Sequence, residues 1–184
     1  MKFEDIFIPG IKVIYPRVFE DPRGYFFESY NQKAFSDAGI SDDFVQSNQS
    51  LSQKGVLRGM HFQCPPHDQS KLVRVIRGAV LDVVIDIRVG SPTYGKHYSI
   101  KLSEENKTVL YIPVGFAHGF LTLEDNTLFS YKCGNFYNKE SEQGLMWNDP
   151  SVGIDWKIQN PILSEKDLNN ESLKDFKSPF IFAP

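Results

Sequence analysis

Four short segments of the chain combine ionisable side chains with the alternating pattern of β-strands. They are residues 21–29 (DPRGYFFES), 56–63 with 71–75 (VLRGMHFQ and KLVRV), 112–120 (IPVGFAHGF) and 131–137 (YKCGNFY). Histidine, tyrosine and lysine side chains can transfer protons or stabilise a developing negative charge. These segments are therefore candidates for acid–base chemistry.

Three of these side chains have both a chemical and a structural interpretation. An imidazole in general titrates near neutrality, so His61 is a candidate general base, or alternatively a buried histidine bonded to the backbone. The phenol of Tyr131 can donate a proton, but it also suits a core tyrosine of the strand expected at 127–133. Lys71 is a candidate stabiliser of negative charge, or a lysine at a strand edge whose amine reaches water.

Asp167 is open to two interpretations as well. A carboxylate on the far ring nitrogen of a histidine fixes the tautomer and stabilises the imidazolium, so Asp167 is a candidate orienter of His61. The spacing from Ser164 to Asp167 also matches a helix-capping box. One side chain does not easily fill both roles, and the residues alone favour the cap.

Sequence motifs of several other enzyme classes are absent. There is no G-x-G-x-x-G, Walker loop, C-x-x-C, H-E-x-x-H or G-x-S-x-G, so dinucleotide binding, P-loop chemistry, thiol redox, zincin hydrolysis and the α/β-hydrolase elbow lose sequence support. The four histidines form neither H-x-H nor H-x-x-H, and metal sites usually need three or four clustered ligands. We therefore expect no metal and no other cofactor.

Short strands must position these side chains. Residues 81–89 show a period of two, with Asp82 and Asp86 on the face opposite Leu81, Val83 and Ile85. Similar runs, separated by turn signals rich in glycine, proline and aspartate, occur at 11–14, 25–30, 45–50, 56–63, 71–77, 98–102, 108–112, 119–123 and 127–133. Many short, closely spaced strands indicate a sandwich, a barrel or a jelly roll.

Helix signals are few. Residues 31–38 suit about two turns ended by Gly39, and a capping pattern begins a short helix at Ser164. No repeat or linker divides the chain, so we expect a single domain over residues 1–184, with the tail 169–184 packing on its body.

Length and charge exclude several classes of protein. The chain has 184 residues, of which 41% are hydrophobic, enough for a core without disulfide or metal support. The net charge is −3 and no run of five basic residues occurs, so we expect no nucleic-acid partner. No apolar run approaches 18 residues and no signal peptide is recognised, which predicts a cytoplasmic protein that does not bind membranes, with Cys64 and Cys133 as free thiols.

Blocks of sequence from residue 3 to residue 168 resemble the dTDP-4-dehydrorhamnose 3,5-epimerase family. The blocks are RGMHFQ, KLVRVIRGAVLDVVIDIR, SPTYGK, IPVGFAHGFLTL, YKC, WNDPSVGIDW and LSEKD, and their order and spacing make the match specific. The resemblance implies a cupin-type double-stranded β-helix, an all-β jelly roll with a few short helices. It also implies a homodimer and a reaction without a cofactor.

The family converts dTDP-4-dehydro-6-deoxy-D-glucose to dTDP-4-dehydro-L-rhamnose by inverting C3 and C5 beside the C4 ketone. For this chain the resemblance implies His61 as the base, Tyr131 as the acid on the opposite ring face, and Lys71 as the stabiliser of the enolate oxygen. It also favours the pairing of Asp167 with His61 over the helix cap.

The resemblance further implies a set of substrate-binding residues. Arg23 and Arg58 match phosphate-contacting positions, and Phe26 and Tyr137 match an aromatic pair around thymine. His118 either reaches the substrate or is a packed histidine in a turn. The remaining implied positions are Glu28, Gln46, Asn48, Glu142 and Lys166. In this family the segment 23–28 reaches the neighbouring subunit, so dimerisation would complete the site.

Strict alternation places Arg58 and His61 on opposite faces of their strand, although both are expected at one site. We therefore predict a bulge at Gly59. Three positions depart from the family pattern: Met60, Ser70 and Phe136. They remove no proposed catalytic group but leave the preferred sugar open. An epimerase acting at C3 or C5 alone and a non-catalytic nucleotide-sugar-binding cupin remain alternatives.

Overall fold

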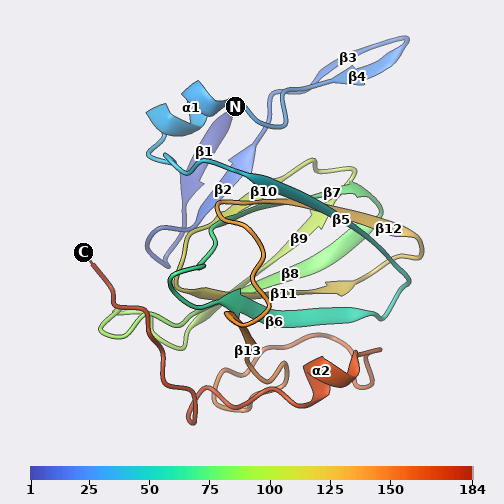
Figure 1. The fold of residues 1–184 in the computed structure, drawn as a ribbon. Helices are drawn as coiled ribbons and strands as arrows, with labels where there is room; N and C mark the ends of the chain where they lie inside the picture. The colour runs from blue at the N-terminus through green and yellow to red at the C-terminus, as the bar shows by residue number, and fades with distance from the viewer. Residues whose placement is uncertain (184) are drawn as a thin grey trace.

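Two antiparallel β-sheets lie face to face in the computed structural model, which describes residues 1–183 (Figure 1). The six-stranded sheet has the order β1–β2–β10–β7–β12–β5, and the five-stranded sheet has the order β13–β6–β11–β8–β9. Most neighbouring strands are not consecutive in the chain, so the chain crosses repeatedly between the sheets. This arrangement confirms the all-β jelly roll expected from the sequence.

The strands match the predicted runs closely. The six-stranded sheet contains β1 (Lys2–Asp5), β2 (Lys12–Tyr15), β10 (Val109–Ile112), β7 (Lys71–Arg77), β12 (Thr127–Cys133) and β5 (Gln46–Ser52). The five-stranded sheet contains β13 (Glu142–Gly144), β6 (Leu57–Gln63), β11 (Phe116–Thr122), β8 (Ala79–Asp86) and β9 (His97–Ser103). A separate hairpin consists of β3 (Phe19–Asp21) and β4 (Gly24–Phe26).

Three strands escaped prediction, and two predicted runs are too long. β1, β3 and β13 have three or four residues each and bury little apolar surface, so they show no clear alternation. The run predicted at 25–30 keeps only its first residues, because the chain leaves the hairpin after Phe26. The run predicted at 81–89 ends at Asp86, whose carboxylate accepts hydrogen bonds from the turn that follows.

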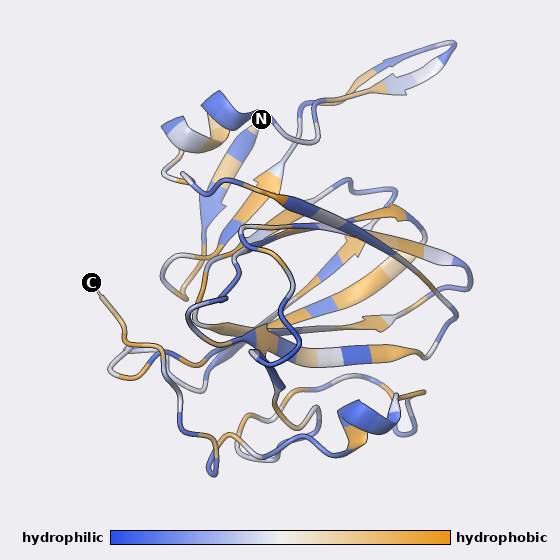
Figure 2. Cartoon of the chain, in the orientation of Figure 1, coloured by the Kyte–Doolittle hydropathy of each residue, from blue (hydrophilic) through white to orange (hydrophobic). Residues whose placement is uncertain are grey.

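The buried apolar residues form three clusters. Two of them lie on the two faces of the five-stranded sheet, because β8 and β11 are buried on both faces. Val84 and Phe120 pack between the two sheets, whereas Ile85 and Leu121 pack on the outer face of the five-stranded sheet. The third cluster packs α1 (Gln32–Asp37), through Phe35, against the outer face of the six-stranded sheet. In Figure 2 the strands of both sheets carry most of the strongly hydrophobic residues, and the outward side of α1 is hydrophilic.

The C-terminal segment covers the five-stranded sheet (Figure 1). Leu173, Phe176 and Phe180 are buried in the outer cluster of that sheet. Backbone hydrogen bonds join Val89 to Phe180 and to Phe182. Before this tail runs α2 (Glu165–Leu168), capped by Ser164 as the sequence predicts. Apolar burial in the tail therefore holds α2 near β6.

The β3–β4 hairpin projects away from the body of the molecule (Figure 1). Its side chains are exposed, among them Phe19 at 50% and Phe26 at 66%. Exposed aromatic side chains on a projecting element often mark a contact surface.

The predicted irregularity at Gly59 is present. On β11, His118 pairs with His61 and Phe120 pairs with Arg58, so β6 has one residue more than its partner over this stretch. Gly59 has φ +143, and a Cβ there would lie 2.5 Å from the Cα of Gly119. The extra residue lets Arg58 and His61 line the same cavity.

Gly59→Ala should lower the free energy of unfolding by about 2–4 kcal/mol, because the methyl group meets backbone and the φ value disfavours a side chain. Gly24→Ala is the matched control, since φ is +125 but no atom lies within 4 Å of the added carbon. Urea unfolding measures both. Equal losses in the two variants would show that the close approach to β11 contributes nothing.

Candidate active site

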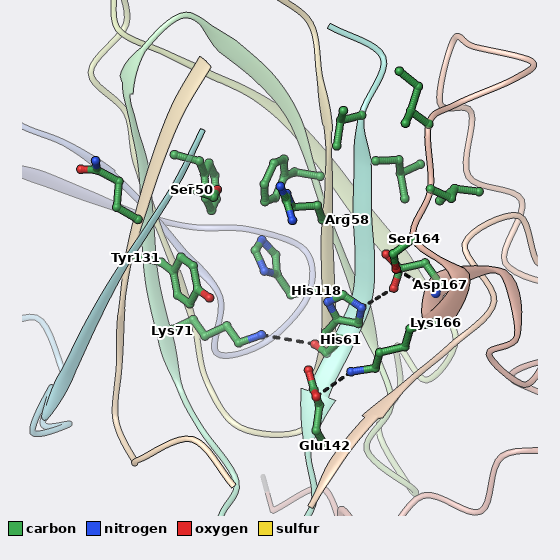
Figure 3. A pocket seen from close by; sticks show the side chains of 17 residues that line it. Ser50, Arg58, His61, Lys71, His118, Tyr131, Glu142, Ser164, Lys166 and Asp167 are labelled. Carbon is green, nitrogen blue, oxygen red and sulfur yellow. Dashed lines mark hydrogen bonds and ion pairs between the residues drawn. The ribbon is translucent and has the colours of Figure 1, made fainter. Parts of the chain in front are cut away.

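A cavity of about 480 Å³ opens between the two sheets (Figure 3). Its wall is built by β5, β7 and β12 on one side and by β6, β11, β13 and α2 on the other. Small-molecule sites usually have volumes of roughly 300–1,000 Å³. The ionisable side chains that line it are Arg58, His61, Lys71, His118, Tyr131, Glu142, Lys166 and Asp167.

His61 and Asp167 form a close pair at one side of this cavity. His61 Nε2 lies 2.5 Å from Asp167 Oδ1, and the aspartate side chain is only 4% exposed. Burial by itself would raise the pKa of Asp167, but the hydrogen bond and charge interaction with His61 hold that pKa below its usual value. A carboxylate in this position can fix one tautomer of the ring.

The cap and the pairing use different parts of Asp167. Ser164 Oγ accepts a hydrogen bond from the Asp167 backbone N–H at 3.2 Å, which leaves the carboxylate free for His61. The two interpretations that the sequence set against each other are therefore compatible in the folded chain.

Tyr131 lies on the opposite side of the cavity from His61, with Lys71 reaching between them (Figure 3). Lys71 Nζ donates to the backbone oxygen of His61 at 3.3 Å. Burial lowers the pKa of Lys71 against the attraction of nearby Cys133 and Asp82. Burial also raises the pKa of Tyr131, so its phenol keeps its proton at neutral pH.

A second histidine–aspartate pair completes the inner wall. His118 Nε2 lies 3.0 Å from both carboxylate oxygens of Asp82, and both side chains are buried. Burial raises the pKa of Asp82 although His118 and Lys71 oppose that shift. Sequence reasoning did not include Asp82 in the site. Its signal was an acidic residue within the apolar strand pattern of residues 81–89.

At the edge of the cavity, Glu142 joins two other predicted residues. Tyr137 Oη donates to Glu142 Oε2 at 2.9 Å, and Lys166 Nζ lies 2.6 Å from the same oxygen. Burial would raise the pKa of Glu142, but its contacts with Lys166 and Tyr137 leave the pKa lowered. This carboxylate links the loop after β12 to α2.

The predicted residues Gln46 and Asn48 on β5 join this cluster through hydrogen bonds, whereas Arg58 on β6 lines the cavity. Gln46 Oε1 accepts from the Tyr137 backbone N–H at 2.9 Å, and Gln46 Nε2 donates to Asn48 Oδ1 at 3.1 Å. Arg58 lines the cavity and donates from Nε to Ser52 Oγ at 3.1 Å, which leaves its terminal nitrogens available. These groups could hold a polar ligand along the cavity mouth.

A family model described as dTDP-4-dehydrorhamnose 3,5-epimerase matches residues 5–175. The chain belongs to this family. A curated dTDP-4-dehydrorhamnose 3,5-epimerase from Shigella flexneri is 52% identical over 169 residues, covering 91% of this chain and 93% of the relative.

Solved structures of epimerases agree with this assignment. A dTDP-4-dehydrorhamnose 3,5-epimerase from Elizabethkingia anophelis has 50% identity and a TM-score of 0.91, covering 95% of this chain and 97% of that one. A dTDP-6-deoxy-D-glucose-3,5-epimerase from Legionella pneumophila, in complex with dTDP-4-keto-L-rhamnose, has 43% identity and a TM-score of 0.94 over 99% of each chain.

Three residues predicted for the epimerase site lie away from the cavity of their own chain. Arg23 and Phe26 are on the projecting hairpin, where Arg23 forms an ion pair with Asp21. Glu28 follows the hairpin and accepts a hydrogen bond from Asn31 at 3.2 Å. Within the chain itself these side chains do not join His61.

Among residues 1–183, no helix is long and apolar enough to cross a membrane.

Asp167→Asn should destabilise this epimerase by about 1–3 kcal/mol at pH 7, because it removes a buried charged hydrogen bond. The pKa of Asp167 is lowered on folding, so the ionised carboxylate stabilises the fold above its ordinary pKa of about 3.9. That advantage is lost as the pH falls through the lowered pKa.

Unfolding in urea from pH 7 down to pH 3 measures this difference. Asp155→Asn is the control, because the pKa of that carboxylate is also lowered, by its contact with Lys157, but its side chain is exposed. We expect the Asp155 variant to match wild type. A difference between Asp167→Asn and wild type that does not shrink as the pH falls would contradict the assignment.

Proposed function

We propose that the protein inverts C3 and C5 of dTDP-4-dehydro-6-deoxy-D-glucose to give dTDP-4-dehydro-L-rhamnose. The observation that carries this proposal is the pairing of His61 with Asp167 across one cavity from Tyr131. Family membership and the keto-rhamnose bound to the Legionella relative support the choice of substrate. The product would enter dTDP-rhamnose and surface-polysaccharide synthesis in the cytoplasm.

The reaction needs three groups around the sugar ring. A proton at C3 or C5 is acidic only because the adjacent C4 ketone can take up the negative charge as an enolate. Inversion then requires a base on one ring face, an acid on the other face, and a group that stabilises the enolate oxygen. A positioned acid or base typically contributes about 10²–10⁴-fold, and one preorganised donor to the oxygen contributes about 10²–10³-fold.

We assign these roles to residues of the cavity. Neutral His61 removes the proton, and Asp167 stabilises the imidazolium that results. The Lys71 ammonium stabilises the enolate oxygen, because a charge in a partly enclosed cavity acts with little screening from water. Tyr131 returns a proton on the opposite face, and His118 contacts the sugar. This sequence of proton transfers needs no cofactor.

The nucleotide part of the substrate would occupy the cavity mouth. Arg58 has terminal nitrogens suited to the diphosphate, and Tyr137 offers an exposed ring for stacking on thymine. We assign Gln46, Asn48, Glu142 and Lys166 to the same region because hydrogen bonds and an ion pair join them in one group around Tyr137.

A second copy of the chain would complete the nucleotide site. The hairpin that carries Arg23 and Phe26 projects from its own subunit and exposes both side chains. We propose that the protein is a homodimer in which Arg23, Phe26 and Glu28 of each subunit serve the neighbouring cavity. In such a dimer the partner would cover the ring of Phe26, which is 66% exposed in the single chain.

Turnover of dTDP-4-dehydro-6-deoxy-D-glucose in D₂O tests the reaction. Wild type should incorporate deuterium at C3 and C5 and yield an L-rhamno product after reduction. His61→Ala should lose exchange at both carbons, by about 10²–10⁴-fold, while it still binds dTDP. Tyr131→Phe should exchange at C3 better than it completes both inversions.

The outcomes of this experiment separate the alternatives. Exchange at C3 alone in wild type would indicate a mono-epimerase. Binding of dTDP without exchange would favour a nucleotide-sugar-binding protein. Normal product from Tyr131→Phe would remove that residue as the acid.

Mixing two inactive variants tests the shared site. Arg23→Ala should impair the neighbour's cavity, and His61→Ala should inactivate its own. Random reassociation should restore about one quarter of wild-type activity, because half of the dimers are mixed and each has one intact site. A mixture of His61→Ala with Lys71→Ala is the control, since both changes affect the same cavity. No recovery in the first mixture would exclude a site completed by Arg23 of a second copy.

A further inference from the structure

The loop of residues 134–141, here called the aromatic loop, presents Phe136 and Tyr137 to solvent beside the cavity. Their side chains are 63% and 55% exposed. A loop with so much exposed apolar surface gains little stability from its own packing. Its position therefore depends on the polar groups that hold its backbone.

Gln63, at the end of β6, holds this backbone from inside the protein. The residue is only 4% exposed. Its Oε1 accepts from the Asn138 backbone N–H at 2.7 Å, and its Nε2 donates to the backbone oxygens of Phe136, at 3.2 Å, and of His67. Both N–H groups and the carbonyl of the amide are therefore used.

The contacts of Gln63 fall on either side of Tyr137. Gln46 accepts a hydrogen bond from the Tyr137 backbone N–H, and Glu142 accepts one from the Tyr137 hydroxyl group. Three consecutive residues of the aromatic loop are thus tied to side chains of β5, β6 and β13. Gln63 differs from the other two partners because it is almost fully buried, and unlike Glu142 it does not line the cavity.

We infer that Gln63 is a positioning residue that fixes the ring of Tyr137 relative to His61, which lies two residues earlier on the same strand. It does so by binding the backbone on both sides of Tyr137 without touching the substrate. The inference rests on the proposed function, in which Tyr137 stacks on the thymine of a dTDP-sugar. This role does not involve the side chains proposed to transfer protons at C3 and C5 of the sugar.

Removal of the amide has a defined physical consequence. In Gln63→Leu the Asn138 N–H and two carbonyl oxygens lose their buried hydrogen-bond partner. These groups can recover hydrogen bonds with water if the loop moves outward, so the displaced position becomes more favourable. If only a fraction of molecules then holds Tyr137 in place, the apparent affinity for nucleotide falls by that fraction. The proposed base His61, the proposed acid Tyr131 and Lys71 all lie outside the aromatic loop. The rate at saturating substrate, kcat, should therefore change little.

The experiment compares steady-state turnover and dTDP titration in wild type and Gln63→Leu. We expect KM and the Kd of dTDP to rise about tenfold while kcat stays within about threefold. Thr127→Val is the matched control, because it removes the hydrogen bond that the buried Thr127 hydroxyl donates to the Glu124 carbonyl oxygen, at the opposite end of β12. It should lower stability without changing KM.

A double-mutant cycle with Tyr137→Ala tests whether Gln63 acts through that ring. If it does, Gln63→Leu adds less than about twofold to the KM of Tyr137→Ala, because the ring to be positioned is gone. Multiplicative effects of the two changes, a loss confined to kcat, or an equal rise of KM in Thr127→Val would each overturn the inference.

Failure of the proposed function can be told apart from failure of this inference. Wild-type turnover in the same assay tests the function, and the dTDP titration tests Gln63 even if the keto-sugar is not converted. A wild type that binds no dTDP overturns both. Should Gln63→Leu fail to fold, Gln63→Glu keeps the size and the acceptor oxygen but loses the donors to Phe136 and His67, and the same rise in Kd is expected.

Discussion

The contact between His61 and Asp167 joins segments that are 106 residues apart and fixes the His61 imidazole at the cavity wall. An almost fully buried carboxylate is costly unless it is hydrogen-bonded, so α2 can dock on β6 only where the imidazole meets it. A helix of four residues has no stability of its own. The Ser164 cap and the apolar tail that follows hold it in place. The hydrophobic packing of Leu173, Phe176 and Phe180 on the far side of the sheet thus supports a polar contact in the cavity.

The bulge in β6 solves a second geometric problem. A regular strand would turn either Arg58 or His61 away from the cavity, because they are three positions apart and side chains alternate between the two faces. The extra residue at Gly59 brings both side chains to one wall, and the close backbone of Gly119 leaves no room for a larger residue there. The phosphate-binding and proton-transfer groups proposed for this strand are therefore spaced by an irregularity rather than by the pleat.

Much of this arrangement could be predicted from the sequence, for identifiable reasons. Long runs such as 127–133 alternate clearly, and Ser164 signals its helix through the capping pattern. Strand order could not be predicted, because pairings such as β12 with both β5 and β7 join distant segments that no local pattern specifies. The ionisable residues that line the cavity were predicted, but Asp82 was missed because an acidic residue within an apolar strand pattern does not by itself indicate a contact with His118. The hairpin contacts the body through Lys107, which lies 4.5 Å from the centroid of the Tyr25 ring, and this contact does not indicate what Arg23 and Phe26 bind.

The two histidine–aspartate pairs of the cavity are not equivalent, and the difference supports the choice of base. Asp82 is fully buried, and burial outweighs its contacts with His118 and Lys71, so its pKa is raised. Asp167 receives enough hydrogen bonds to overcome burial, so its pKa is lowered and it stays a carboxylate. A carboxylate that remains ionised stabilises the imidazolium formed when a histidine takes a proton. His61 is also the more accessible ring, at 28% exposure against 7% for His118. Proton removal is therefore better matched to His61, and the buried His118 to holding the substrate.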